Sequence, residues 1–189
     1  MRLILLVISL IAFPAFSAWQ LDNDKSSLTF ISIKKSDVAE VHHFNQLVGN
    51  VDNSGKVSFV IDLISVDTNI AVRNERMKEF LFNTDVFPKA KFTTQLDMAK
   101  FNAIAKNSSG VMKLTGEIDL HGNIQKVIVD VLVAKLSDSQ FIVSSMKPVL
   151  LNAQKFGLDT GVQKLKELAK LPSISNAVPV SFVLSFNQN

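Results

Sequence analysis

The sequence predicts an all-β domain, an antiparallel sandwich or barrel of seven or eight strands accompanied by two short helices. Three observations lead to this prediction. Most of the chain behind the N-terminus alternates with a period of two, the alternating runs are rich in β-branched and aromatic residues, and Asn, Asp, Gly, Ser and Pro bound them. Helical patterns between the runs are few, which favours an antiparallel architecture.

The N-terminus has the three regions of a secretory signal peptide. Arg2 supplies a positive charge, an apolar run extends from Leu3 to Phe13, and small residues lead to two cleavage sites, after Ser17 or after Ala18. The alternative, a membrane anchor, is disfavoured because the run is shorter than the roughly 20 residues that span a bilayer. We therefore expect a signal peptide over residues 1–18, one domain over residues 19–189, and export.

The composition excludes several classes of site. The chain has no cysteine, which removes disulfides, thiolate zinc sites and c-type haem attachment, so the stability of the domain must come from its core. A formal net charge of +3 without a Lys/Arg cluster argues against a nucleic-acid partner. The 14 phenylalanines occur without any tyrosine, and this aromatic surface without polar groups suits a dry core or a dry cavity.

The expected strands follow one another at regular spacing, with turn residues between them. Asn53–Gly55 and Asn107–Gly110 are hairpin or loop signals. The strands are expected at Leu28–Ile33, Val41–Val51, Val57–Leu63, Ala90–Leu96, Val111–Leu120, Val127–Leu136, Phe141–Val149 and Val178–Phe186.

The run Val127–Leu136 is apolar on both of its faces. Its odd positions up to Val133 are all valine, while Ile128, Leu132 and Ala134 occupy even positions. A barrel with a packed interior and a solvated exterior needs only one apolar face. Either something covers the outside of this strand, or the interior is lined for a ligand.

Two amphipathic segments predict helices. The first is expected over Ala71–Phe82, capped by Thr68 or Asn69, with an apolar stripe that includes Phe80. The second is expected over Gly161–Leu171, with Asp159 or Thr160 at its start and Pro172 at its end. We interpret both as lids that pack on the barrel.

No catalytic constellation is visible in the sequence. His42 and His43 are adjacent, so on a strand they point to opposite faces and cannot both bind one metal ion from the same side. Nucleophile elbows, phosphate-binding glycine loops and HExxH helices are absent from the sequence. One enzymatic alternative remains, a metal-dependent or acid–base site that uses His121 with Asp119 or His43. We expect no enzyme and no metal.

The phenylalanines are distributed about one to a strand. Ligand pockets are mostly apolar, and the interior of a β-barrel is a common place for one. A lined cavity and a packed core give the same pattern, so the local sequence leaves both open. The candidate lining residues are Phe30, Phe44, Phe59, Phe80, Phe92, Phe141 and Phe182.

A set of short motifs spans residues 19–182 in order. They are Trp19–Asp22, Ser65–Asn69 with Arg73, Phe87-Pro88 with Phe92, Gly116–Gly122, Lys155–Leu158 and Ala177–Phe182. Together they resemble the YceI-like family. The resemblance implies a lipocalin-like antiparallel β-barrel of about eight strands with two short helices, located in the periplasm.

The resemblance also implies a function. Members of that family are regarded as binding or carrier proteins, and their interior cavity holds a polyisoprenoid or a similar amphiphilic lipid, including isoprenoid quinones. This favours a lined cavity, with a bound lipid and no other cofactor. Asp67, Arg73 and His121 would then form a polar rim that contacts the head group. The alternative is that these three belong to a structural network that fixes the loop from Ser65 to Arg73.

Several positions depart from the family pattern, so the identity of the ligand is not transferred. They are Asn74, Asp119 and the run Asn123–Gln125. An accessory module that delivers quinone to a membrane redox partner is a third functional hypothesis. The expected partners are an amphiphilic lipid and, transiently, a membrane or a membrane protein. The oligomeric state, a dimer included, is left open.

Overall fold

The computed structural model of the chain describes residues 17–188. The strands are β1 (Ser17–Lys34), β2 (Val38–Phe44), β3 (Leu47–Asp52), β4 (Lys56–Asp62), β5 (Val66–Asp67), β6 (Lys89–Gln95), β7 (Ser108–Leu120), β8 (Asn123–Lys135), β9 (Gln140–Ser145), β10 (Val149–Asn152) and β11 (Ala177–Gln188). The helices are α1 (Ala71–Arg76), α2 (Met98–Ala103) and α3 (Asp159–Leu168), with the π-helical segment η2 (Met77–Phe82) and the 3₁₀ turns η1 (Leu63–Ser65) and η3 (Ala153–Phe156).

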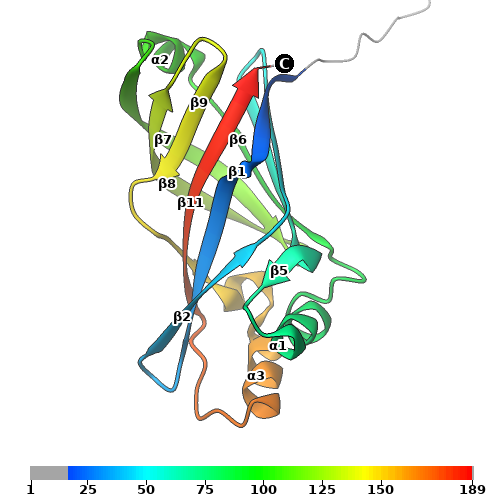
Figure 1. The fold of residues 1–189 in the computed structure, drawn as a ribbon. Helices are drawn as coiled ribbons and strands as arrows, with labels where there is room; N and C mark the ends of the chain where they lie inside the picture. The colour runs from blue at the N-terminus through cyan, green and yellow to red at the C-terminus, as the bar shows by residue number, and fades with distance from the viewer. Residues whose placement is uncertain (1–16, 189) are drawn as a thin grey trace, which may run out of the picture.

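One antiparallel sheet closes on itself to form a barrel (Figure 1). Around the barrel the strand order is β1, β3, β4, β6, β7, β8, β9 and β11, and β11 pairs again with β1. Closure leaves these eight strands without a free edge. The short strands β2, β5 and β10 extend the sheet beyond the ring. This confirms the predicted lipocalin-like antiparallel β-barrel.

Two predicted strands are each divided in the structure. The run Val41–Val51 contains β2 and β3, which separate at Asn45-Gln46. The run Phe141–Val149 contains β9 and the first residue of β10, and Pro148 lies in the break between them. Proline has no N–H to donate to a sheet ladder, which accounts for the interruption. The predicted loop at Asn107–Gly110 is also shorter than expected, because Ser108 already begins β7.

The first predicted helix has the expected range but a different character and a different cap. α1 continues directly into η2, so the second half of the segment is π-helical. The N-cap residue is Ile70, and it makes no side-chain capping bond. Neither predicted residue is the N-cap. The Thr68 hydroxyl donates a hydrogen bond to Asn74 Oδ1 at 2.5 Å, and Asn69 adopts a left-handed φ of 60° in the loop before the helix.

The other helices also differ from expectation. α3 begins two residues earlier than predicted and ends at Leu168, ahead of Pro172; its N-cap is Leu158 rather than Asp159 or Thr160. α2 was not predicted, because six residues are too few to show helical periodicity. Its N-cap is Asp97, whose carboxylate accepts a hydrogen bond from the Lys100 N–H at 3.1 Å.

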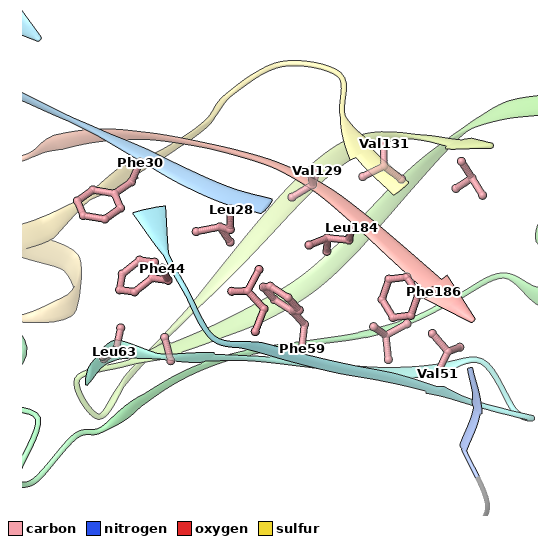
Figure 2. Packing of buried hydrophobic residues seen from close by; sticks show 14 of the residues in the cluster. Leu28, Phe30, Phe44, Val51, Phe59, Leu63, Val129, Val131, Leu184 and Phe186 are labelled. Atoms are coloured by element: carbon pink, nitrogen blue, oxygen red, sulfur yellow. The ribbon is translucent and has the colours of Figure 1, made fainter. Parts of the chain in front are cut away.

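The core lies inside the barrel, where apolar side chains from opposite walls face one another (Figure 2). β8 illustrates the alternation. Its residues Val129, Val131 and Val133 are buried, whereas Ile128 and Leu132 on the outer face are 65% and 37% exposed. β8 is therefore apolar on both faces, as its sequence indicates, with one face toward the barrel interior and the other on the outside.

The predicted signal peptide, residues 1–18, lies outside the described residues except for Ser17 and Ala18, which begin β1. Within residues 17–188, no helix combines the length and the apolar character needed to cross a membrane.

Candidate functional site

The barrel interior contains a cavity of about 550 Å³. This volume lies within the range of roughly 300–1,000 Å³ that is usual for small-molecule pockets. All eight barrel strands contribute to its wall, and so do α1, η2 and α3. The side chains of the wall are mostly Val, Leu, Ile and Phe. The cavity therefore suits a ligand with a large apolar surface.

Six of the seven phenylalanines predicted to line a cavity lie in this wall: Phe30, Phe44, Phe59, Phe92, Phe141 and Phe182. Phe80 lies outside it; the side chain is half-buried, and Lys164 Nζ lies 5.9 Å from its ring centre. The prediction placed Phe80 on an apolar stripe with α-helical spacing. Met77 and Leu81, which share that stripe, do reach the cavity. Because η2 is π-helical, with its hydrogen bonds spanning five residues, Phe82 joins them in place of Phe80. Ligand binding by these residues stays a prediction.

One end of the cavity is closed by an aromatic plug, which we define as Trp19, Phe101, Phe141 and Phe186. The Phe141 ring stacks on Phe186 with centroids 5.0 Å apart and contacts Trp19 and Phe101 edge-on at 4.9 and 5.1 Å. Phe101 is buried and comes from α2, which covers this end of the barrel (Figure 1). Lys135 Nζ lies 4.4 Å from the centre of the Phe101 ring.

At the opposite end the cavity reaches the surface. α1, α3 and the hairpin formed by β1 and β2 lie at this end (Figure 1). Ile70 and Val72 both line the cavity and are 46% and 56% exposed. We call this end the mouth. Its boundary is formed by Ile70, Val72 and Arg73 and by the hairpin residues Ser32, Lys34, Glu40 and His42.

The hairpin carries a polarity gradient toward the mouth. Along residues 28–34 of β1 and 40–44 of β2 the even-numbered residues line the cavity, and Ile31 lines it as well. Phe30 pairs with His42, and Ser32 pairs with Glu40. From the barrel interior outward the lining changes from Phe44 to the pair Phe30–His42, then to the pair Ser32–Glu40, and finally to Lys34. An apolar chain with a polar end matches this order of side chains.

His42 is a buried histidine within this gradient, with 2% of its surface exposed. Its Nε2 lies 2.8 Å from the Ser32 hydroxyl, and its ring lies beside Phe30 at 5.2 Å. Nδ1 is buried and has no hydrogen-bond partner in the protein. Burial lowers the His42 pKa to about 4, helped by the positive charge of Arg73, so the imidazole is neutral at pH 7.

Arg73 reaches from α1 to the hairpin across the mouth. Its Nη1 donates to Glu40 Oε2 at 2.8 Å, and its Nη2 donates to the Thr68 carbonyl at 2.6 Å. Lys34 Nζ lies 2.7 Å from the same Glu40 oxygen. The hydrogen bond from Lys34 and the charges of Arg73 and Lys34 lower the pKa of Glu40, which is therefore ionised. Arg73 Nε is buried and without a partner in the protein.

The other two residues of the predicted polar rim lie outside the cavity wall. The Asp67 carboxylate accepts hydrogen bonds from the Asn69 N–H at 2.8 Å and from the Asn74 amide at 3.3 Å. Those hydrogen bonds, that of Asn69 first, lower its pKa. Its other oxygen lies 3.8 Å from His43 Nε2. These hydrogen bonds join Asp67 to the loop before α1 and to α1 itself.

His121 lies in the turn between β7 and β8, with a left-handed φ of 54°. Its ring lies 4.4 Å from Phe87, and no side-chain hydrogen bond or ion pair of the described residues joins it to Asp119 or His43. Asp119 is paired in register with Lys91 on β6. Within residues 17–188, no group of three or more His, Cys, Asp or Glu is placed to hold a metal ion.

Arg73 is a predicted rim residue that does line the cavity, but the polar lining contributed by the hairpin was not predicted. The expected strands ended at Ile33 and resumed at Val41, which excluded Lys34 and Glu40. The signal was nevertheless present. Once a hairpin is centred on the turn after Lys34, the period of two places the even positions on the same face as Phe30 and Phe44.

Comparisons with known proteins agree with one another on the family and on the fold of the chain. The family description "YceI-like domain" matches residues 19–186. A solved polyisoprenoid binding domain from Saccharophagus degradans, described as implicated in plant cell wall breakdown, is 36% identical, covers 92% of this chain and 100% of its own, and superposes with a TM-score of 0.90. A comparison with curated proteins gave no match.

Two more distant structures share the fold. BcnA from Burkholderia cenocepacia is 20% identical, with 87% of this chain and 98% of its own covered and a TM-score of 0.66. A Campylobacter jejuni YCEI protein is 15% identical, with 78% and 84% covered and a TM-score of 0.55. At these identities the likeness concerns the barrel alone.

Proposed function

The chain belongs to the YceI-like family, and we propose that it is an exported binding protein that holds an amphiphilic lipid in its barrel cavity. The lipid is a polyisoprenoid, an isoprenoid quinone or a similar molecule, and the protein carries or stores it. The observation that carries the proposal is the apolar cavity of about 550 Å³, closed at one end and polar at the other. The Saccharophagus degradans relative, a polyisoprenoid binding domain by name, supports the ligand class.

The physical basis of binding is transfer of an apolar chain out of water. Each buried CH₂ group contributes about 0.8 kcal/mol before the cost of ordering the chain. The aromatic plug offers an apolar surface to the far end of the chain, and Ser32 and His42 offer hydrogen bonds to its polar end. The lipid therefore lies with its tail at the plug and its head at the mouth.

The compartment we propose is the periplasm. The support is the N-terminal signal pattern, which would release the domain into an aqueous space beside a membrane, where an apolar lipid does not diffuse alone. No reaction is required of such a protein, and we propose binding without catalysis. Delivery of quinone to a membrane redox partner stays a prediction.

The test is recovery of lipid from gently purified protein by organic extraction and mass spectrometry. Three proteins are compared: the wild type, Val131→Phe and Leu132→Phe. Val131 is fully buried on the inner face of β8, whereas Leu132 is its neighbour on the outer face. The first substitution fills part of the cavity, and the second adds the same ring outside the barrel.

We expect a reproducible lipid in the wild type and in Leu132→Phe, and at least a fivefold lower yield in Val131→Phe. Far-UV circular dichroism checks that all three proteins are folded. Wild-type protein without lipid, or equal lipid in both variants, would contradict binding in the cavity.

A further inference from the structure

The cavity wall carries an excess of positive charge. At the mouth, three cationic side chains line it and only one carboxylate does: Lys34, Arg73 and Arg76 against Glu40. Glu40 is engaged by both Lys34 and Arg73 at 2.7 and 2.8 Å. One carboxylate cannot neutralise these cations, so the wall remains cationic at neutral pH. A neutral head group would leave this charge uncompensated.

Two buried polar atoms at the mouth have no partner within the protein. Arg73 Nε is a donor only, so an acceptor atom must satisfy it. His42 Nδ1 is buried in a residue that is 2% exposed and lines the cavity. When the Ser32 hydroxyl donates to Nε2, the neutral ring carries its proton on Nδ1 and is a second donor. Buried polar groups are normally hydrogen-bonded, so these two atoms point to a ligand.

We propose that the mouth is a subsite for an anionic oxygen head group, a phosphate or a carboxylate, which accepts hydrogen bonds from Arg73 Nε and His42 and is attracted by Lys34 and Arg76. The inference rests on the proposed function, because the apolar tail of the same molecule occupies the cavity. It narrows the ligand class: acidic amphiphiles bind more tightly than quinones or alcohols with the same tail. Hydrogen bonds between charged groups and oxyanions are the stronger kind, which gives this selectivity.

Equilibrium dialysis with tritiated ligands tests the subsite. The probes are geranylgeranyl phosphate, geranylgeranoic acid and geranylgeraniol, which have the same isoprenoid tail and differ in the head. We expect at least one of the two acids to bind at least tenfold more tightly than the alcohol in 50 mM salt. The acid that binds more tightly identifies phosphate or carboxylate as the head. Because the attraction is electrostatic, 500 mM salt should reduce this preference several-fold.

Substitutions at the mouth test which side chains cause the acid to bind more tightly than the alcohol. Arg73→Met should weaken binding of the preferred acid about tenfold and change binding of geranylgeraniol less than twofold. Arg76→Met should act in the same direction by a smaller factor. Lys113→Met removes the same charge from the outer face of β7, where the side chain is exposed, and should leave all three affinities unchanged.

The outcomes separate the two proposals. Equal affinity of the wild type for all three probes would overturn the head-group subsite while leaving lipid binding intact. Equal weakening of acid and alcohol by Arg73→Met would also overturn it. Failure of every probe to bind the wild type would overturn the proposed function and the subsite with it.

Discussion

The two ends of the barrel differ in their side chains: the plug is aromatic and apolar, and the mouth is charged and polar. At the plug, Phe141 contacts three aromatic rings within 4.9 to 5.1 Å and is only 2% exposed. At the mouth, Arg73, Glu40 and Lys34 form ion pairs that are each about a quarter to a third exposed. The plug therefore serves stability, because it is close-packed and apolar, whereas the mouth keeps buried polar atoms without partners, which costs stability.

This contrast explains why one molecule combines a disulfide-free barrel with a binding site. Of the four buried side-chain atoms without partners among the described residues, two belong to the mouth, His42 Nδ1 and Arg73 Nε. Apolar packing in the plug and in the barrel wall offsets the free-energy cost of these unpartnered polar atoms.

The largest effect is expected at the plug. Phe141→Ala removes a buried ring from the stack and should lower the free energy of unfolding by about 3–5 kcal/mol. Phe182→Ala is the comparison, because Phe182 is half-buried in the cavity wall; its cost should be about half or less. Urea denaturation of both variants measures the difference. Equal costs would show that the plug has no special role in stability.

The second effect is a pH dependence that comes from His42. An unfolded histidine accepts a proton below about pH 6.5, whereas His42 in the folded protein does so only near pH 4. The unfolded state therefore binds more protons between these values, and folding stability falls as the pH falls from 6.5 to 4. A shift of this size corresponds to about 3 kcal/mol.

The measurement is urea denaturation at several pH values for the wild type and His42→Phe. The difference between the two proteins isolates the imidazole, because carboxylates that titrate near pH 4 are present in both. We expect a flatter profile for the variant between pH 4 and 6.5. Parallel profiles would mean that His42 is not held neutral by burial.

The third effect concerns the position of the helices at the mouth. Gly161 lets α3 approach η2 closely, because a Cβ at this position would lie 2.5 Å from the Phe80 carbonyl oxygen and 2.8 Å from Leu81 Cα. Gly161→Ala forces backbone to move and should cost about 1–3 kcal/mol. Thermal unfolding checks this cost. An unchanged melting temperature would show that the contact is not tight.

The smallest effect is expected from the ion pairs at the mouth. Glu40→Gln removes the carboxylate that joins Lys34 to Arg73, and the change in unfolding free energy should stay below about 1 kcal/mol because the pairs are partly solvated. Urea denaturation at low and high salt measures it. A loss of several kcal/mol would mean that the mouth is a structural element rather than a place for a ligand.

The barrel could be predicted from the sequence because strand periodicity is local and recurs along the chain, as in β8. The mouth and the plug could not be predicted in this way, because they depend on the hydrogen-bonding pattern of a single helical turn and on contacts between residues far apart in the chain. The π-helical turn exchanged Phe80 for Phe82 in the cavity wall, and no periodicity argument distinguishes those two positions beforehand. Likewise Trp19 and Phe101 are 82 positions apart, and only the closed barrel and the six-residue α2 bring their rings to within 6.2 Å.

Trp19 provides the most direct test of the central claim, that a lipid lies with its tail at the plug and its head at the mouth. It is the only tryptophan of the chain, and its ring contacts Phe101 and Phe141, both of which line the cavity. The measurement is quenching of its fluorescence by 16-bromohexadecanoic acid and by 2-bromohexadecanoic acid at saturation. We predict strong quenching by the acid brominated at the tail and little by the acid brominated beside the head. Equal quenching by both acids, or the reverse order, would contradict the proposed orientation.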